Sequence, residues 1–224
     1  MNYIISCDGG FLTKETVDQY YPDNLADAVH AWLTREIPEY LAHKFSWRDA
    51  VLLRAYYYDC YPMIGKLTNP FSGKELFMKD DQRKSFLHDL ATLPSICLRT
   101  GKITHAGWRL SSRKIEEMKH KSRMDLFIRD FEPFFVQKGV DTKLTLDALQ
   151  LVMQGNVPVH AMVFITGDSD FAPLFDLLRQ YGVRVILAPL GGQVQHMLLA
   201  SVDDVLDVQF NTSSIKGKMS KSIA

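Results

Sequence analysis

Apolar runs alternate along the chain with segments whose apolar residues recur every three or four positions. The runs are rich in β-branched and aromatic residues and predict strands at 3–7, 51–58, 96–105 (interrupted at Gly101), 159–166, 183–187 and 205–210. The segments with helical spacing predict helices at 24–41, 79–93, 141–153, 171–181 and 194–201. Strands that alternate with helices over short turns are typical of a mostly parallel sheet covered on both faces.

Residues 163–171 carry the most informative local pattern. A buried apolar strand is predicted to end in Gly-Asp-Ser-Asp, and a helical pattern follows. In an open α/β sheet, ligands bind at the carboxyl ends of strands, where Asp168 and Asp170 fall. Two carboxylates in one turn repel each other unless a cation or a shared proton compensates. Asp168 or Ser169 could instead cap the helix, but a cap needs only one such residue, so we favour a metal or catalytic role.

Two more acids follow predicted elements in the same way. Asp8 comes directly after the first strand, and Asp141 follows Lys138-Gly139-Val140 at a helix start, where the helix dipole stabilises a carboxylate. If the sheet is parallel, both acids meet Asp168 and Asp170 at one edge. Carboxylate oxygens are preferred ligands of Mg²⁺ and Mn²⁺, which in turn favour phosphate substrates.

Composition sets limits on partners and compartment. The 224 residues are 46% hydrophobic and 23% charged, as in an ordinary globular protein, and the formal net charge is zero. Any contact with nucleic acid must therefore come from a local patch and not from a global positive field. Cys7, Cys60 and Cys97 are odd in number and widely spaced, which predicts reduced core cysteines. No apolar run has the length of a membrane span and no signal peptide is evident, so we expect a cytoplasmic protein without membrane contact.

Three motifs together carry a family resemblance. They are Tyr56-Tyr57-Tyr58-Asp59, Lys138-Gly139-Val140-Asp141 with Asp147, and Thr166-Gly167-Asp168-Ser169-Asp170-Phe171. In order and spacing they resemble the NYN domain, a branch of the PIN-like nucleases, in its LabA-like bacterial form. The resemblance implies a three-layer α/β/α sandwich over residues 1–210. The Ser- and Lys-rich composition of residues 211–224 separately predicts a flexible tail. The resemblance also implies an acidic catalytic and metal site made by Asp8, Asp141, Asp168 and Asp170, with Asp147 in a supporting role.

The function implied is that of a ribonuclease dependent on Mg²⁺ or Mn²⁺, acting on single-stranded RNA and leaving 5′-phosphate and 3′-hydroxyl ends. Ser169 and Lys138 are candidates for holding a phosphate oxygen, although a solvated Lys138 fits equally well. A basic stretch at 109–123 includes Arg113, a third candidate for RNA binding. A solvated helix face with ion pairs at i,i+3 and i,i+4 explains that stretch slightly better. A homodimer stays open, because many small nucleases act as dimers.

Two other functions compete with the ribonuclease. A haloacid-dehalogenase-like phosphatase also places an Asp after its first strand, but it needs a second Asp at position 10, which here is Gly10. A catalytically weak NYN module that binds RNA or a partner protein is the stronger competitor. The family follows its first Asp-Gly with an Asn that helps to order the site, whereas here Phe11 follows Gly9 and Gly10.

Overall fold

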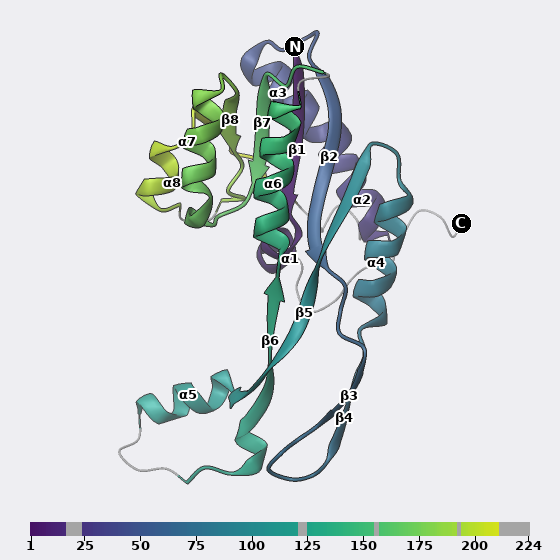
Figure 1. Ribbon diagram of the computed structural model, residues 1–224, viewed down its shortest axis with the longest axis vertical. Helices are drawn as coiled ribbons and strands as arrows, with labels where there is room; N and C mark the ends of the chain where they lie inside the picture. The colour runs from purple at the N-terminus through teal and green to yellow at the C-terminus, as the bar shows by residue number, and fades with distance from the viewer. Residues whose placement is uncertain (17–23, 121–124, 155–156, 192–193, 211–224) are drawn as a thin grey trace, which may run out of the picture.

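The computed structural model describes residues 1–16, 24–120, 125–154, 157–191 and 194–210, and a seven-stranded sheet forms its centre (Figure 1). The strand order is β6-β5-β2-β1-β7-β8-β9. The strands are β1 (Asn2–Asp8), β2 (Val51–Cys60), β5 (Ile96–Leu110), β6 (Phe131–Lys138), β7 (Ala161–Ile165), β8 (Arg184–Leu187) and β9 (Asp204–Val205). All neighbours pair in parallel except β5 and β6, which are antiparallel. The predicted, mostly parallel sheet is therefore confirmed.

Helices cover both faces of this sheet and complete the predicted three-layer sandwich. One face carries α1 (Gly9–Thr16), α2 (Leu25–Ala31), the π-helical turn η1 (Trp32–Glu36), α3 (Ile37–Phe45) and α4 (Asp81–Thr92). The other carries α6 (Val140–Met153), the 3-10 turn η3 (Ser169–Phe171), α7 (Ala172–Gln180) and α8 (His196–Ala200). Alternate residues of each central strand point into one of two apolar cores, as the period of two along a strand requires. Ile4, for example, faces α6 and α7, whereas Ile5 faces α2 and α3.

The predicted strands and helices of the sandwich are confirmed with three corrections, and two further elements, β6 and α1, lie where none was predicted. The strand predicted at 96–105 is not interrupted at Gly101 and continues to Leu110. Gly101 lies inside it because the backbone of the neighbouring strand comes close: a Cβ at this position would lie 2.7 Å from the Lys138 carbonyl oxygen. The helix predicted at 24–41 runs to Phe45, through the π-helical turn. The last strand is only two residues long, not the six predicted at 205–210.

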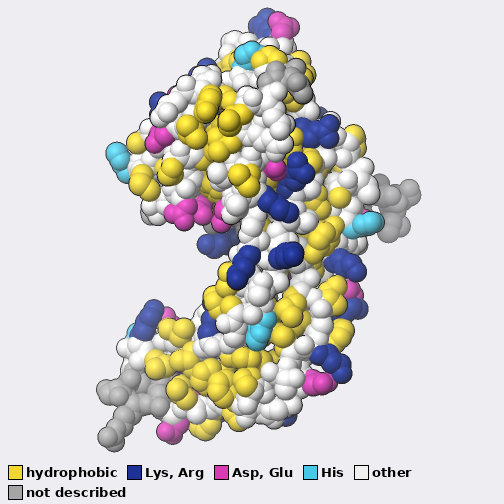
Figure 2. Space-filling view, viewed as in Figure 1, with side chains coloured by type: hydrophobic (Ala, Val, Ile, Leu, Met, Phe, Trp, Pro, Cys, Tyr) yellow, Lys and Arg dark blue, Asp and Glu magenta, His cyan; other side chains and the backbone are white. Residues whose placement is uncertain are grey.

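Below the sandwich, β5 and β6 run on together as an arm (Figure 1). The arm also carries α5 (Ser112–Lys119), the 3-10 turn η2 (Ile128–Asp130) and a hairpin of β3 (Gly65–Thr68) and β4 (Glu75–Met78). The Phe71 and Phe131 rings, 4.7 Å apart at their centroids, join this hairpin to β6. The surface is hollowed where the arm leaves the sandwich, and acidic side chains lie on the sandwich side of this hollow (Figure 2).

Other expectations fall partly outside the described residues. The tail at 211–224 and the basic residues Lys121 and Arg123 lie there.

The three cysteines are free, and Cys7 and Cys60 are buried, as predicted. Among the helices of the described ranges, none combines the length and apolarity that crossing a bilayer requires.

Candidate active site

The four predicted acids come from three places at the carboxyl edge of the sheet. Asp8 is the last residue of β1, and Asp168 and Asp170 follow its parallel neighbour β7 through a short turn. Asp141 lies in the first turn of α6, just after β6 has returned from the arm. Gly139 makes this approach possible, because it turns the chain with φ 81°, a left-handed conformation that glycine adopts without strain.

Electrostatic coupling links Asp141 to each of the other three acids. Burial raises the pKa of Asp8 to about 6, with a further rise from Asp141, although the Phe11 backbone N–H, 3.2 Å away, opposes the shift. The pKa of Asp141 is also raised, first by partial burial and then by the charges of Asp168 and Asp170. Within the described residues, no Lys, Arg or His nitrogen lies within 4.0 Å of any of the four carboxylates. The site therefore concentrates negative charge that no described residue neutralises within ion-pair distance.

The donor set suits a hard divalent cation, since it consists of carboxylate oxygens on a solvent-accessible edge. No three His, Cys, Asp or Glu side chains in the described part of the chain converge closely enough to bind an ion as they stand. Like charges favour side-chain rotamers that separate the carboxylates. Asp168 also makes the helix cap that is the alternative role for this turn, because its Oδ1 accepts a hydrogen bond from the Asp170 N–H at 2.9 Å. Capping engages this one oxygen and is compatible with a second role.

Asp147 and Asp59, the other acids in the resembling motifs, have partners of their own. Asp147 accepts a hydrogen bond from the Tyr58 hydroxyl at 3.3 Å and pairs with Arg99 at 2.9 Å, which agrees with the supporting role expected for it. Asp59 is fully buried and forms a short ion pair with Arg83 of α4. Burial nevertheless raises the pKa of Asp59, and its charge contributes to the raised pKa of Asp8. Asp59 therefore belongs to the electrostatic surroundings of the site, a role the sequence did not indicate.

Phe11, which stands near the position of the family Asn, has a structural function. Its ring packs against Gly167, where an added Cβ would lie only 2.7 Å from Cε2 of the ring. The contact joins the first turn of α1, directly after Asp8, to the turn after β7 that precedes Asp168. Only a residue without a side chain leaves room for the ring there.

An amide reaches the site from an unexpected direction. A Cβ at Gly10 would lie 3.3 Å from Asp8 Oδ1 and 3.5 Å from Gln137 Oε1, so the Gln137 side chain lies beside the first acid. Gln137 is exposed at the end of β6, and its amide has no hydrogen-bond partner among the described residues. Its position could not be predicted from the sequence, because the apolar pattern does not predict β6. In the sequence, the one indication that Gln137 lies near the acids is its place directly before the Lys-Gly-Val-Asp motif.

A comparison with protein families identifies the family that this acidic edge belongs to. Residues 100–209 match the family model of the NYN domain. The chain carries an NYN domain. The matched range contains Asp141, Asp168 and Asp170, whereas Asp8 lies before it, on the strand that pairs with β7. NYN domains belong to the PIN-like nuclease superfamily, whose members generally depend on divalent metal ions, and the α/β/α sandwich agrees with this membership.

Solved structures and curated proteins add little to the family match. A crystal structure of a protein of unknown function from Vibrio parahaemolyticus is 13% identical, with 92% of this chain and 91% of that chain covered and a TM-score of 0.45. A structure of a Sir2 variant with a deacetylated p53 peptide and 3′-O-acetyl ADP ribose is 8% identical, with 99% and 94% covered and a TM-score of 0.35. Both scores are too low to carry an argument about function. No curated protein matches the chain.

The three candidate substrate-binding residues of the NYN domain are not all in one place. Lys138 is exposed at the end of β6, two residues before α6, and Ser169 lies in η3 between Asp168 and Asp170. Arg113 lies in α5 on the arm, with a side chain 90% exposed and 3.4 Å from Glu117. Ion pairs at i,i+3 and i,i+4 run along this helix, as the solvated-face interpretation of the basic stretch predicts. Only Lys138 and Ser169 are near the acids.

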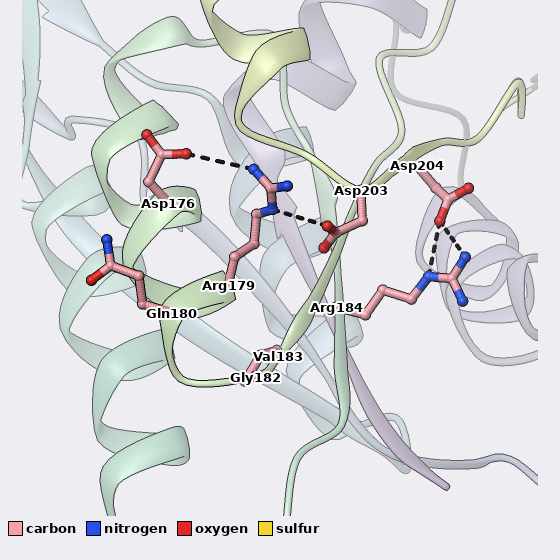
Figure 3. Close-up of a pocket in the computed structure, with 8 residues that line it drawn as sticks. All are labelled: Asp176, Arg179, Gln180, Gly182, Val183, Arg184, Asp203 and Asp204. Carbon is pink, nitrogen blue, oxygen red and sulfur yellow. Dashed lines mark hydrogen bonds and ion pairs between the residues drawn. The ribbon is translucent and has the colours of Figure 1, made fainter.

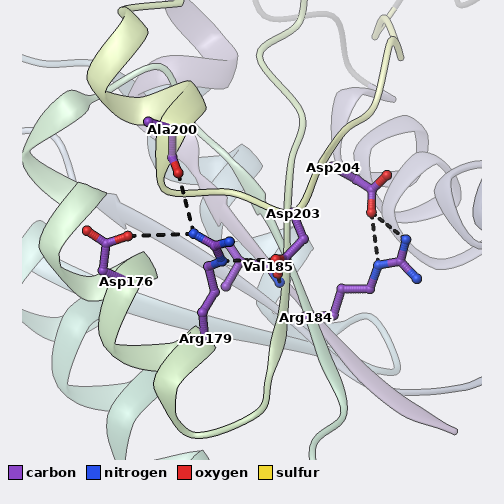
Figure 4. Close-up of polar contacts among 7 residues, drawn as sticks. All are labelled: Asp176, Arg179, Arg184, Val185, Ala200, Asp203 and Asp204. Atoms are coloured by element: carbon purple, nitrogen blue, oxygen red, sulfur yellow. Dashed lines mark hydrogen bonds and ion pairs between the residues drawn. The ribbon is translucent and has the colours of Figure 1, made fainter.

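A hollow of about 890 Å³ lies at the opposite, amino edge of the sheet, between α7, β8 and the segment before β9 (Figure 3). Its charges are paired. Arg179 lies 2.9 Å from Asp203 and 3.8 Å from Asp176, and Arg184 donates two hydrogen bonds to Asp204 (Figure 4). Because each of these arginines has a carboxylate partner, this hollow does not offer the unneutralised charge of the acidic edge.

Proposed function

We propose that this NYN domain is a divalent-metal-dependent ribonuclease that hydrolyses phosphodiester bonds in single-stranded RNA. The observation that supports this most is that Asp8, Asp141, Asp168 and Asp170 all lie at the carboxyl edge, with no cationic partner among the described residues. An acid cluster of this kind is stabilised by a cation from outside the chain. Phosphodiester hydrolysis fits it, because the family is nuclease-type and a phosphate needs charge neutralisation.

The residues have distinct roles in this proposal. A divalent cation bound by the four acids would lower the pKa of a water molecule and stabilise charge on the phosphate oxygens. The Phe11 N–H holds the Asp8 carboxylate in place, and Asp168 holds the turn that presents Asp170. The Ser169 hydroxyl donates to a phosphate oxygen from this turn, and the Lys138 ammonium group contributes positive charge from the end of β6.

The compartment we propose is the cytoplasm. All three cysteines are free, and Cys7 and Cys60 are buried, as in proteins that stay in a reducing environment.

Labelled single-stranded RNA tests the proposal. The purified chain should cut it in Mn²⁺ or Mg²⁺, and cleavage should stop in EDTA. Asp168→Asn should abolish cleavage while the fold persists, because Asn also caps a helical turn. Asp176→Asn is the matched control, since Asp176 is an Asp at the opposite edge of the sheet, and its cleavage should equal that of the wild type. Equal cleavage by Asp168→Asn and the wild type would refute the ribonuclease.

A second candidate is a catalytically weak NYN module that binds RNA or a partner protein. Two observations favour it: Phe11 fills the place near Gly167, and no three acids of the described chain converge as they stand. This candidate predicts that RNA binds equally well in EDTA and in Mn²⁺, and that micromolar protein cuts neither RNA nor DNA.

A further inference from the structure

A pocket of about 330 Å³ lies beside the acidic edge, where the arm meets the sandwich. Its walls come from the segment after β2, from β4, from the start of α4 and from β5 and β6. The residues that line it are Pro62, Met63, Met78, Lys79, Asp80, Arg83, Ile103, Phe135 and Gln137. Gln137 also lies next to Asp8, so the pocket and the acids share a boundary.

The walls are mostly apolar and include one aromatic ring. Ile103 and Gln137 are direct partners across β5 and β6, and Phe135 lies two residues before Gln137 on the same face of the strand. Phe135 packs against His105, with ring centroids 5.7 Å apart, which fixes its ring at the wall. Such a surface suits a flat, apolar-faced group.

The polar groups of the pocket are largely committed to the protein. Asp80 caps α4 by accepting the Arg83 N–H at 2.9 Å, and the Arg83 guanidinium pairs with the buried Asp59. Lys79 pairs with Asp81. The Gln137 amide differs, since it has no partner among the described residues and is exposed. It offers a donor and an acceptor side by side at the mouth of the pocket.

We propose that this pocket receives one unpaired nucleobase of the RNA strand and that Gln137 positions it by bonding to its edge. Pockets of about 300 Å³ and more hold small ligands. Aromatic side chains stack on bases, and amides pair with the donors and acceptors of base edges. An apolar side chain of a partner protein would use the same walls but would leave the Gln137 amide without a partner. The inference rests on the proposed ribonuclease, because the pocket's position would place this base on a nucleotide next to the scissile phosphate.

Binding in EDTA tests the pocket without cleavage. We expect at least one of AMP, GMP, CMP and UMP to bind the full chain in a calorimetric titration, whereas ribose 5-phosphate, which lacks a base, should not bind. Gln137→Ala should weaken the binding of that nucleotide about tenfold, as the loss of a hydrogen bond implies. Met78→Trp should abolish binding by filling the pocket from an arm strand outside both apolar cores. Gln150→Ala, which removes an exposed amide on α6, is the matched control and should bind as the wild type does.

Cleavage in Mn²⁺ separates failure of the pocket from failure of the ribonuclease. Four RNA strands that differ in one base should be cut at unequal rates, and Gln137→Ala should reduce this preference while cleavage persists. The proposed base pocket would be refuted if cleavage showed no base preference and mononucleotides bound no better than ribose 5-phosphate. The proposed ribonuclease would not be affected by that result. Nucleotide binding that Met78→Trp abolishes, without cleavage of any strand, would support the pocket and overturn the ribonuclease.

Discussion

The two edges of the sheet differ in whether their acids are paired with basic side chains. At the amino edge, Asp203 and Asp204 are matched by Arg179 and Arg184 at 2.9 Å or less (Figure 4). At the carboxyl edge, four acids gather, and the described chain provides no basic partner within ion-pair distance. Both edges belong to the same sheet, so the sheet architecture alone cannot explain why acids are paired at one edge and unpaired at the other.

The amino-edge charges stabilise the fold. Asp203 accepts the Val185 N–H at 2.8 Å as well as bonding Arg179, and the Arg184 guanidinium lies 4.7 Å from the Phe45 ring centroid. These contacts connect α3, α7, β8 and the segment before β9. The carboxyl-edge acids make few such contacts: Asp141 raises the pKa of Asp8, and Asp168 and Asp170 raise the pKa of Asp141. Acids with partners hold the protein together, whereas acids without partners are available to a ligand.

Of the changes considered, replacing an acid on α6 should have the largest effect, and this effect is on RNA cleavage. Asp141→Asn should lower kcat/KM for RNA about 10³-fold, or roughly 4 kcal/mol of transition-state stabilisation, because a ligand of the cation is lost. Asp147→Asn changes an acid on the same helix that already has Arg99 and Tyr58 as partners. It should cut at nearly the wild-type rate and lose about 1 kcal/mol of stability. Equal loss of cleavage in both variants would contradict the distinction between matched and unmatched acids.

The buried pair of Asp59 and Arg83 should show the largest loss of stability. Arg83→Met leaves the fully buried Asp59 without its ion pair and should lower the free energy of unfolding by about 3 kcal/mol in urea denaturation. The double variant Asp59→Leu/Arg83→Met should recover part of this loss, because the uncompensated buried charge is removed. No recovery would mean that packing, and not charge, explains the loss.

Removing one acid from each edge should change stability in opposite directions. In EDTA at pH 7, Asp8→Asn should raise the free energy of unfolding by about 1 to 3 kcal/mol, because it removes a partly buried charge from a repulsive cluster. Asp203→Ala should lower it by about 1 to 2 kcal/mol through the lost contacts to Arg179 and Val185. Added Mn²⁺ should stabilise the wild type more than Asp8→Asn. Thermal unfolding measures all three effects.

The gain from Asp8→Asn should depend on pH. The pKa of Asp8 rises from 3.8 to about 6 on folding, so the folded state disfavours the ionised form. The wild type therefore loses stability as the pH rises from about 4 through 6, and the loss stays constant above that range. The gain in Asp8→Asn should be near zero below pH 4 and about 1 kcal/mol larger at pH 7 than at pH 5. Unfolding in EDTA across this range checks it, and a gain independent of pH would show that the Asp8 charge is not its source.

The sandwich could be predicted from the sequence because its strands are buried on both faces. Residues 161–165 are fully apolar and fully buried, and strands of this kind form continuous apolar runs in a sequence. The arm could not be predicted in this way. In β6 and the outer half of β5, aromatic and polar residues are mixed, because these strands pair mainly with each other and most of their side chains stay partly exposed. Helix α1 was also missed, since its first two residues are glycines, which disfavour helices.

The acid cluster was predictable for a related reason. In a parallel sheet, residues that follow strands meet at one edge whatever the loops between them do, so the order of elements was enough to group Asp8, Asp168 and Asp170. Contacts between side chains that are far apart in the sequence depend instead on the path by which the chain returns to the sheet. Gln137 reaches Asp8 only because β6 turns back along β5, and Arg83 reaches Asp59 only because α4 packs over the end of β2.

The sequence by itself determined the layered α/β fold and the carboxylates at its carboxyl edge, since both follow from local periodicity and strand order. Only the tertiary structure decided which acids are neutralised within the chain. It paired Asp203 and Asp204 with arginines at one edge and left the four acids at the other without such partners among the described residues. The physical reason is that a charge is matched by whatever lies within a few ångströms in space, and distance in space is not set by distance along the chain.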